Sequence, residues 1–178
     1  MGVLNIPNTL TLLRIVAIPF FASTLIYKRY DIALAVFVAA SITDALDGLI
    51  ARVTNKQTKL GQFLDPMADK FLLITSFILF AIYGWVPTWL TISIISRDLI
   101  VLLGWGLFYM IHHVVFIRPS ILGKSAIAAQ MVLLAYILLR INFRELLPDQ
   151  TVLIWVTAIL TVASGLYYIV KGLMYTNG

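Results

Sequence analysis

The chain has 178 residues, of which 61% are hydrophobic and only 12% are charged. Soluble proteins carry roughly 25% charged residues, so this composition favours an integral membrane protein. The absence of cysteine excludes disulfide bonds, thiolate catalysis and zinc held by cysteine. The net charge is +5, but the basic residues lie at the ends of hydrophobic segments, which indicates anchoring at a membrane rather than nucleic-acid binding. The length is typical of one domain, here residues 1–178.

Six long hydrophobic segments follow one another along the chain. They run from about Asn8 to Tyr27, Ile32 to Arg52, Gly61 to Tyr83, Pro87 to His112, Ser120 to Arg140 and Thr151 to Gly172. Each is near the roughly 20 residues that a helix needs to cross a hydrocarbon core of about 30 Å. None shows the two-residue alternation of membrane strands. The sequence therefore predicts an all-α integral membrane protein with six transmembrane helices.

Basic residues in short loops predict the orientation, because they are retained on the cytoplasmic side. If the N-terminus is cytoplasmic, the inner side holds Arg14, Arg52, Lys56, Lys59, Arg118, Lys124 and Lys171. The outer side then holds only Lys28, Arg29, Arg140 and Arg144. This bias predicts that both termini are cytoplasmic, and it places residues 44–69 near the cytoplasmic face.

Acidic residues interrupt the second and third hydrophobic segments. The sequence reads Asp-x-x-Asp-Gly-x-x-Ala-Arg from Asp44 to Arg52, then eight spacer residues, then Gly-x-x-x-Asp-x-x-x-Asp from Gly61 to Asp69. An aspartate at the centre of a membrane helix costs roughly 2.5–3.5 kcal/mol. Four unpaired ones would cost on the order of 10 kcal/mol, comparable to the stability of a whole domain. A bound divalent cation is the obvious compensation.

Helical periodicity groups these residues. Asp44 and Asp47 are three residues apart and Asp65 and Asp69 are four apart, so each pair shares one face of its helix. Two such pairs on adjacent antiparallel helices can converge on one site. Four carboxylates suit oxygen-loving cations such as Mg²⁺, Mn²⁺ or Ca²⁺. Arg52 offers a planar fork for a phosphate group.

Two other interpretations of an intramembrane aspartate stay open at this level. The carboxylates could form a proton relay or ion path in a transporter, or they could pair structurally with Arg52, Lys70 and Arg97. Ion-coupled transporters commonly have two related halves. The last three segments carry no second aspartate cluster, which argues against that class.

The complete pattern resembles the signature of the CDP-alcohol phosphatidyltransferase family at every fixed position. The opening Asn5-Ile6-Pro7-Asn8-Thr9-Leu10-Thr11 and the stretch from Phe63 to Lys70 are similar to those of two groups within it, the phosphatidylglycerophosphate synthases and the cardiolipin synthases. The resemblance covers most of the chain, since the family core is also six transmembrane helices. It implies transfer of a phosphatidyl group from CDP-diacylglycerol to an alcohol, with release of CMP.

The resemblance implies roles for the four aspartates. Asp44, Asp47 and Asp65 would hold Mg²⁺ or Mn²⁺, and Asp69 would contact the metal and remove the proton of the accepting hydroxyl. Such chemistry needs charge stabilisation at the diphosphate and a general base near the hydroxyl.

The resemblance also implies a binding surface for the donor. Its residues would be Asp44 and Asp47 together with Gly48, Ala51, Arg52 and Gly61. The small residues would let the cytidine nucleotide lie against the helices, and Arg52 would contact the diphosphate.

The sequence identifies the acceptor alcohol less clearly than the donor. Arg97, Arg118 and Lys124 are candidate ligands for an acceptor phosphate. Alternatively, Arg97 forms a structural pair with Asp98, and the other two set the topology. Ser96-Arg97-Asp98 is closer to the cardiolipin synthases, which use phosphatidylglycerol, but many short bacterial chains with these features resemble enzymes that use glycerol 3-phosphate. We expect glycerol 3-phosphate, with phosphatidylglycerol as the alternative.

The remaining expectations concern location and partners. We expect a multi-pass protein of the bacterial inner (cytoplasmic) membrane, without nucleic-acid partners, and a homodimer is expected from the resemblance alone. His112 and His113 are adjacent and would point in different directions on a helix, so a shared metal is not expected.

Overall fold

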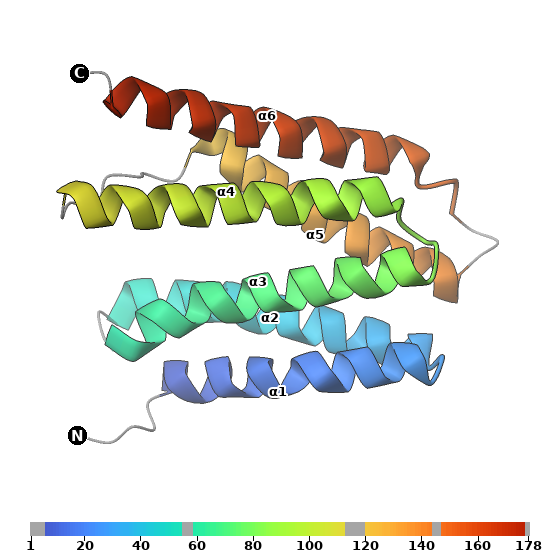
Figure 1. Cartoon of the computed structure of the whole chain (residues 1–178). Helices are drawn as coiled ribbons and strands as arrows, with labels where there is room; N and C mark the ends of the chain where they lie inside the picture. The colour runs from blue at the N-terminus through green and yellow to red at the C-terminus, as the bar shows by residue number, and fades with distance from the viewer. Residues whose placement is uncertain (1–5, 55–58, 113–119, 144–146, 177–178) are drawn as a thin grey trace. The chain divides into compact units, whose positions relative to one another are not determined.

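In the part of the chain that the computed structural model describes, six α-helices follow one another (Figure 1). They are α1 (Ile6–Ile26), α2 (Tyr30–Thr54), α3 (Lys59–Ile82), α4 (Thr88–His112), α5 (Ile121–Asn142) and α6 (Thr151–Thr176). The described residues are 6–54, 59–112, 120–143 and 147–176, with side chains described for 16–43, 70–104, 106, 120–143 and 147–174. The prediction of helices in all six hydrophobic segments is confirmed.

The apolar surface of these helices is typical of a membrane protein. Within the described residues, Ile121–Asn142 and Thr151–Met174 are long and apolar enough to cross a bilayer, and three shorter stretches are also apolar. Large apolar side chains on several helices are highly exposed, including Ile82 at 71% and Val152 at 72%. Such extensive apolar exposure suits lipid better than water. Six crossings and cytoplasmic termini stay predictions.

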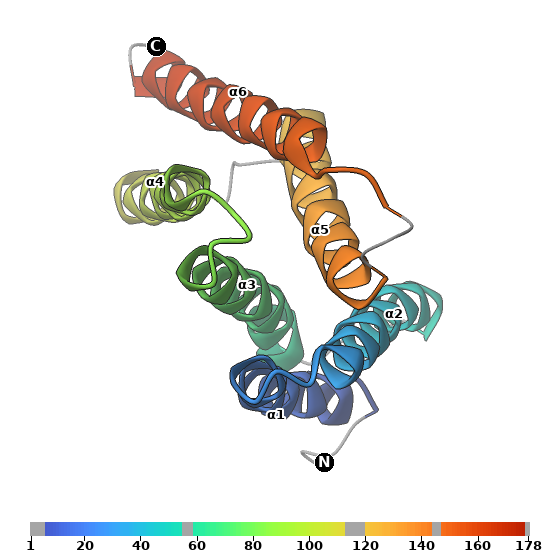
Figure 2. The same ribbon diagram turned by 90° about the vertical axis from the view of Figure 1, so that its right-hand side faces the viewer.

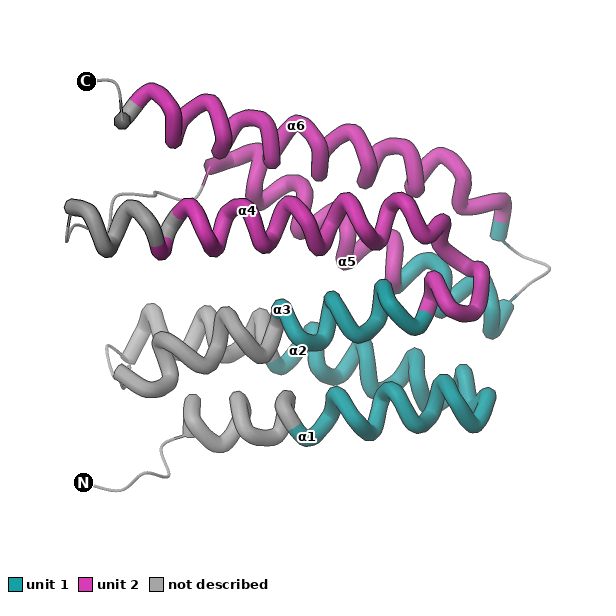
Figure 3. The backbone as a smooth tube through the Cα atoms, in the orientation of Figure 1, with its two compact units in different colours: residues 1–79, 135–147 teal, residues 80–134, 148–178 magenta. Residues whose placement is uncertain are grey.

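The helices group into two compact units (Figure 3). The first comprises residues 1–79 and 135–147, and the second comprises residues 80–134 and 148–178. In the first unit α1 and α2 lie side by side, and in the second α4 and α6 do so (Figures 1 and 2). The single domain expected from the sequence stays a prediction.

Apolar side chains hold the first unit together. Phe21 and Leu25 of α1 are fully buried, as is Ala33 of α2. The Phe21 and Phe37 rings pack with their centroids 6.2 Å apart. The end of α5 is attached to the start of α2, because the Asn142 side-chain amide donates to the carbonyl oxygen of Tyr30 at 3.0 Å. The apolar contacts described in this unit thus lie on α1 and the first half of α2, and the acidic pattern begins further along α2.

Left-handed residues end two of the helices. Lys28 (φ 59°) follows α1 and Gly84 (φ 71°) follows α3. At the second position the amide of Trp85 donates to the Phe80 carbonyl at 2.9 Å, and the amide of Gly84 donates to the Ala81 carbonyl at 3.1 Å. The same pair of bonds occurs around Lys28, which is the Schellman pattern of a helix C-terminus. A tight turn therefore separates α3 from α4.

The second unit combines an aromatic end with a polar seam. Trp89 of α4 and Trp155 of α6 pack with their ring centroids 5.5 Å apart, and Leu90 of α4 and Leu133 of α5 are fully buried. The side-chain amide of Gln150 donates to the Trp85 carbonyl oxygen at 3.2 Å. Further along α6, Thr157, Thr161 and Ser164 are buried polar side chains.

Candidate functional site

The acidic pattern lies on two helices of the first unit. Asp44 and Asp47 belong to α2, and Asp65 and Asp69 belong to α3. The observed helices confirm the periodicity on which the pairing argument depends, since residues three or four apart lie on one side of a helix. Carboxylates are also the donors that Mg²⁺ and Mn²⁺ prefer. The side chains of residues 44–54 and 59–69 lie outside the described part, so the convergence of the four carboxylates stays a prediction.

The residues predicted to contact the donor share this position. Gly48, Ala51 and Arg52 belong to the last turns of α2, and Gly61 to the first turn of α3. Both helices continue through the motif. Gly48 therefore lies about one helical turn after Asp44, and Ala51 lies about one turn after Asp47. Their contacts with a nucleotide are not tested by the structure.

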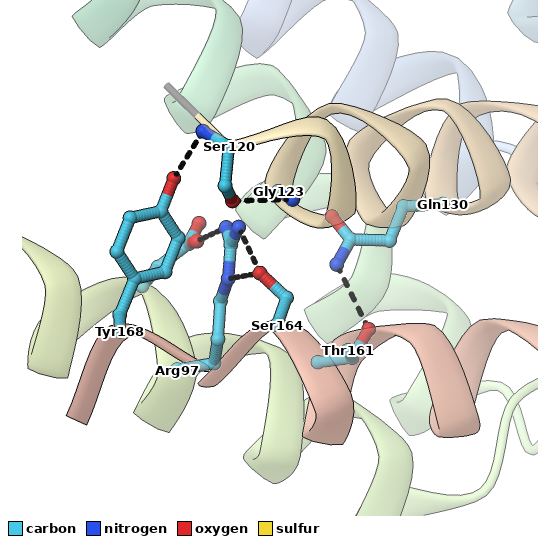
Figure 4. Close-up of polar contacts among 8 residues, drawn as sticks. Arg97, Ser120, Gly123, Gln130, Thr161, Ser164 and Tyr168 are labelled. Carbon is cyan, nitrogen blue, oxygen red and sulfur yellow. Dashed lines mark hydrogen bonds and ion pairs between the residues drawn. The ribbon is translucent and has the colours of Figure 1, made fainter. Parts of the chain in front are cut away.

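Arg97 is the best-defined polar group of the second unit (Figure 4). It lies in the middle of α4 and is only 6% exposed. Its Nη1 donates to Asp98 Oδ1 at 2.6 Å, and its Nε and Nη2 donate to the Ser164 hydroxyl at 3.3 and 2.8 Å. Burying a guanidinium requires such compensation, because an unpaired charge in an apolar interior is very costly. The structural pair with Asp98 considered from the sequence is therefore present.

Three of the five N–H donors of the guanidinium are used in these bonds with described residues. Asp98 balances its charge, so the pair as a whole adds little net positive potential. The structure thus supports a structural role for Arg97 and leaves the acceptor role as a prediction.

A tyrosine of α6 links Arg97 to the start of α5. The Tyr168 ring lies 5.8 Å from the Arg97 guanidinium carbon, within the range of a cation–π contact. Its hydroxyl oxygen accepts the backbone N–H of Ser120 at 3.1 Å. Ser120 in turn caps α5, because its Oγ accepts the backbone N–H of Gly123 at 2.9 Å. Figure 4 shows these side chains gathered at one end of α5.

Gly123 permits the close approach of these groups. A β-carbon built there would lie 2.8 Å from the Tyr168 hydroxyl, 3.1 Å from Ser120 Oγ and 3.2 Å from Arg97 Nη2. The first distance is shorter than real contacts allow. Only glycine therefore lets the first turn of α5 reach Arg97 without displacing its neighbours.

Lys124 and Arg118 are the other predicted acceptor ligands. Lys124 follows Gly123, its side chain is exposed, and its backbone N–H donates to the Ser120 carbonyl at 3.1 Å. The structure thus brings Arg97 and the helical turn that carries Lys124 together, although they belong to different helices. Arg118 and His113 lie outside the described residues, as does the side chain of His112.

A row of polar side chains on α6, of which Thr157, Thr161 and Ser164 are buried, was missed by the sequence reasoning. It consists of Thr157, Thr161, Ser164 and Tyr168, spaced by four, three and four residues. Thr161 accepts the side-chain amide of Gln130 at 3.2 Å, and Thr157 donates to the Ala129 carbonyl at 3.4 Å. Polar side chains at helical spacing in an apolar segment were the available signal, since such residues commonly bond neighbouring membrane helices.

Comparison with known proteins gives one consistent family. A sequence model described as CDP-alcohol phosphatidyltransferase matches residues 4–163. A Bacillus subtilis protein named CDP-diacylglycerol–glycerol-3-phosphate 3-phosphatidyltransferase is 32% identical, with 94% of each chain covered. The Escherichia coli K12 protein of the same name is 34% identical, with 93% of each chain covered. A probable phosphatidylglycerophosphate synthase of Mycobacterium tuberculosis H37Rv is 41% identical over 53% of this chain and 48% of its own length.

Proposed function

Since the chain belongs to the CDP-alcohol phosphatidyltransferase family, we propose that it transfers the phosphatidyl group of CDP-diacylglycerol to glycerol 3-phosphate, giving phosphatidylglycerophosphate and CMP. The observation that carries this proposal is the near full-length similarity to bacterial relatives named for that reaction. The intact signature from Asp44 to Asp69 supports it, because it carries the carboxylates that would hold the metal and act as general base.

The reaction is a substitution at phosphorus. A hydroxyl oxygen of glycerol 3-phosphate bonds to the phosphorus of the phosphatidyl group, and the bond from that phosphorus to the CMP oxygen breaks. The hydroxyl proton passes to the Asp69 carboxylate, which acts as the general base. Positioning and charge stabilisation supply most of the catalysis in such phosphoryl chemistry.

The metal belongs to the same proposal. Asp44, Asp47, Asp65 and Asp69 would hold Mg²⁺ or Mn²⁺, which supplies charge stabilisation at the diphosphate when bound. Carboxylates fit such a cation. Because α2 and α3 are helical through these positions, the two aspartates on each helix share one face. Gly48, Ala51 and Gly61 would leave room for the nucleotide, and Arg52 would bind its diphosphate.

The acceptor phosphate would be bound at the start of α5. Glycerol 3-phosphate is a phosphate monoester and carries a charge of about −1.5 to −2 at neutral pH. Asp98 already neutralises Arg97 at 2.6 Å, so the net positive charge for this anion would come from Lys124 and Arg118. Arg97 would orient the anion. Phosphatidylglycerol, a monoanionic diester that arrives through the lipid, would depend less on these cations.

One assay tests the activity and its acceptor. Purified protein is incubated with CDP-diacylglycerol, Mg²⁺ or Mn²⁺, and either glycerol 3-phosphate or phosphatidylglycerol, and CMP release is measured. We expect product with glycerol 3-phosphate and loss of turnover on chelation, restored by added metal. Cardiolipin from phosphatidylglycerol without product from glycerol 3-phosphate would replace the proposed acceptor. Full activity after thorough chelation would remove the metal from the mechanism.

The membrane arrangement is also proposed. Six crossings of a bacterial inner membrane with both termini cytoplasmic would place the acidic pattern where a water-soluble acceptor can reach it. The chain contains no cysteine, so single cysteines at Lys56 and Thr88 can be labelled without a background. Membrane-impermeant reagent should label position 88 in intact cells and position 56 only after lysis. The reverse pattern would invert the topology. A homodimer, expected from the family resemblance, is tested by crosslinking in membranes.

A further inference from the structure

Tyr168 contacts both Arg97 and the start of the helix that carries Lys124. Its ring lies 5.8 Å from the Arg97 guanidinium carbon, and its hydroxyl accepts the Ser120 N–H at 3.1 Å (Figure 4). Ser120 is 48 residues from Tyr168 in the sequence, so only the tertiary structure brings them together. A single residue of α6 thus connects α4 with the start of α5.

We infer that Tyr168 is a positioning residue for binding of the acceptor phosphate. Tyr168 fixes the position of the first turn of α5, and with it Lys124, relative to Arg97. The inference rests on the proposed function, because it concerns binding of glycerol 3-phosphate. It assigns no contact between Tyr168 and the reacting atoms.

The hydrogen bonds at the start of α5 explain how one hydroxyl can have this effect. Ser120 Oγ accepts the Gly123 amide at 2.9 Å, and the Ser120 carbonyl accepts the Lys124 amide at 3.1 Å. Ser120 therefore organises the turn, and its own N–H is held by Tyr168. Removing the hydroxyl frees Ser120 and allows the turn to shift or rotate relative to Arg97.

Such a shift would matter because phosphate binding by charged groups is geometrically demanding. Charge-assisted hydrogen bonds are short, at about 2.7–2.9 Å for nitrogen donors. Displacing a binding group by about 1 Å can cost a large factor in reaction efficiency. The residues proposed to bind the donor belong to other helices, α2 and α3, so donor affinity should depend less on this turn.

The neighbouring Tyr167 provides a matched control. It belongs to the same helix, is 38% exposed, and its ring lies 5.5 Å from the Lys171 ammonium. Removing its hydroxyl makes the same chemical change one residue away, without touching Ser120.

The test compares Tyr168→Phe with Tyr167→Phe in the CMP-release assay, with both substrates varied. We expect Tyr168→Phe to raise the KM for glycerol 3-phosphate about 5- to 50-fold, with kcat and the KM for CDP-diacylglycerol changed less than about threefold. Tyr167→Phe should match the parent. In a Lys124→Gln background, Tyr168→Phe should add less than about twofold, because its effect is exerted through Lys124.

The outcomes separate this inference from the proposed function. No CMP release by the parent with glycerol 3-phosphate would overturn the proposed function and this inference with it. A parental KM for glycerol 3-phosphate in Tyr168→Phe, in an enzyme that uses that acceptor, overturns the inference alone. Equal losses for both substrates, or full additivity with Lys124→Gln, would show a general structural role and also overturn it. Gly123→Ala, which displaces the Tyr168 hydroxyl, should give the same KM split as a second variant.

Discussion

Replacing Gly123 with alanine should destabilise the protein, although alanine is the better helix former. The new β-carbon would lie 2.8 Å from the Tyr168 hydroxyl and 3.2 Å from Arg97 Nη2. Overpacking of this kind typically costs about 1–3 kcal/mol. Loss of the bond from Ser120 to Tyr168 adds about 0.5–1.5 kcal/mol. Against this stands a gain in helix propensity of about 1 kcal/mol, so the net loss is roughly 0.5–3.5 kcal/mol.

Gly165→Ala is the matched control on α6. Gly165 is buried like Gly123, and it also faces Arg97. A β-carbon there would lie 3.4 Å from Arg97 Cγ, which is ordinary van der Waals contact. The propensity gain should then dominate, and Gly165→Ala should be neutral or more stable by up to about 1 kcal/mol. The same substitution is therefore expected to destabilise the protein at position 123 but not at position 165.

Equilibrium unfolding in detergent micelles measures both variants. The chain has four tryptophans, so their fluorescence can follow the transition. The comparison uses the free energy of unfolding at equal denaturant slope, so that a change in the denatured state is not mistaken for one in packing. Gly123→Ala as stable as the parent, with Gly165→Ala destabilised, would refute the packing described around Arg97.

Three further predictions follow from the catalytic, acceptor and fold features. Asp69→Asn should lower turnover about 10²–10⁴-fold while CDP-diacylglycerol binding persists, because the amide cannot accept the hydroxyl proton. Near-normal turnover with saturating metal would contradict the assignment of Asp69 as the base. Lys124→Gln should raise the KM for glycerol 3-phosphate roughly 10–150-fold, the equivalent of one charge-assisted bond of about 1.5–3 kcal/mol. Arg118→Gln should behave similarly, and steady-state kinetics with each substrate varied would reject either residue whose loss leaves that KM unchanged. Gly84→Ala should cost about 1–2 kcal/mol of unfolding free energy from its φ of +71° alone, since nothing lies within 4 Å of the added carbon; unchanged stability in the micelle assay would show that the turn relaxes.

Arg97 shows where sequence reasoning reached its limit. The sequence placed a charged residue in the middle of an apolar segment and left two roles open, a structural pair with Asp98 or an acceptor ligand. The pair is observed at 2.6 Å, but the hydroxyl of Ser164, which lies 67 residues further along the chain, completes the burial. No local pattern identifies which hydroxyl on a distant helix will solvate a buried guanidinium.

The polar row on α6 could also be recognised only in part from the sequence. Thr157, Thr161 and Ser164 recur at helical spacing, so a polar face could have been noticed. Its partners could not, because the pairing of Thr161 with Gln130 depends on how α5 and α6 pack. Such interhelical hydrogen bonds contribute only about 0.6 kcal/mol each on average. Each one therefore imposes too little on the sequence for its partner to be recognised there.

The sequence by itself determined the six helices, the membrane character and the catalytic family, because each depends on information carried by neighbouring residues. Long apolar runs must form helices to satisfy their backbone in lipid, and the spacing from Asp44 to Asp69 is local to two helices. Only the tertiary structure decided that Gly123, Tyr168 and Ser164 surround Arg97. Those contacts join α4, α5 and α6 across long sequence separations, and they depend on side-chain packing at the point where a glycine lets the helices approach.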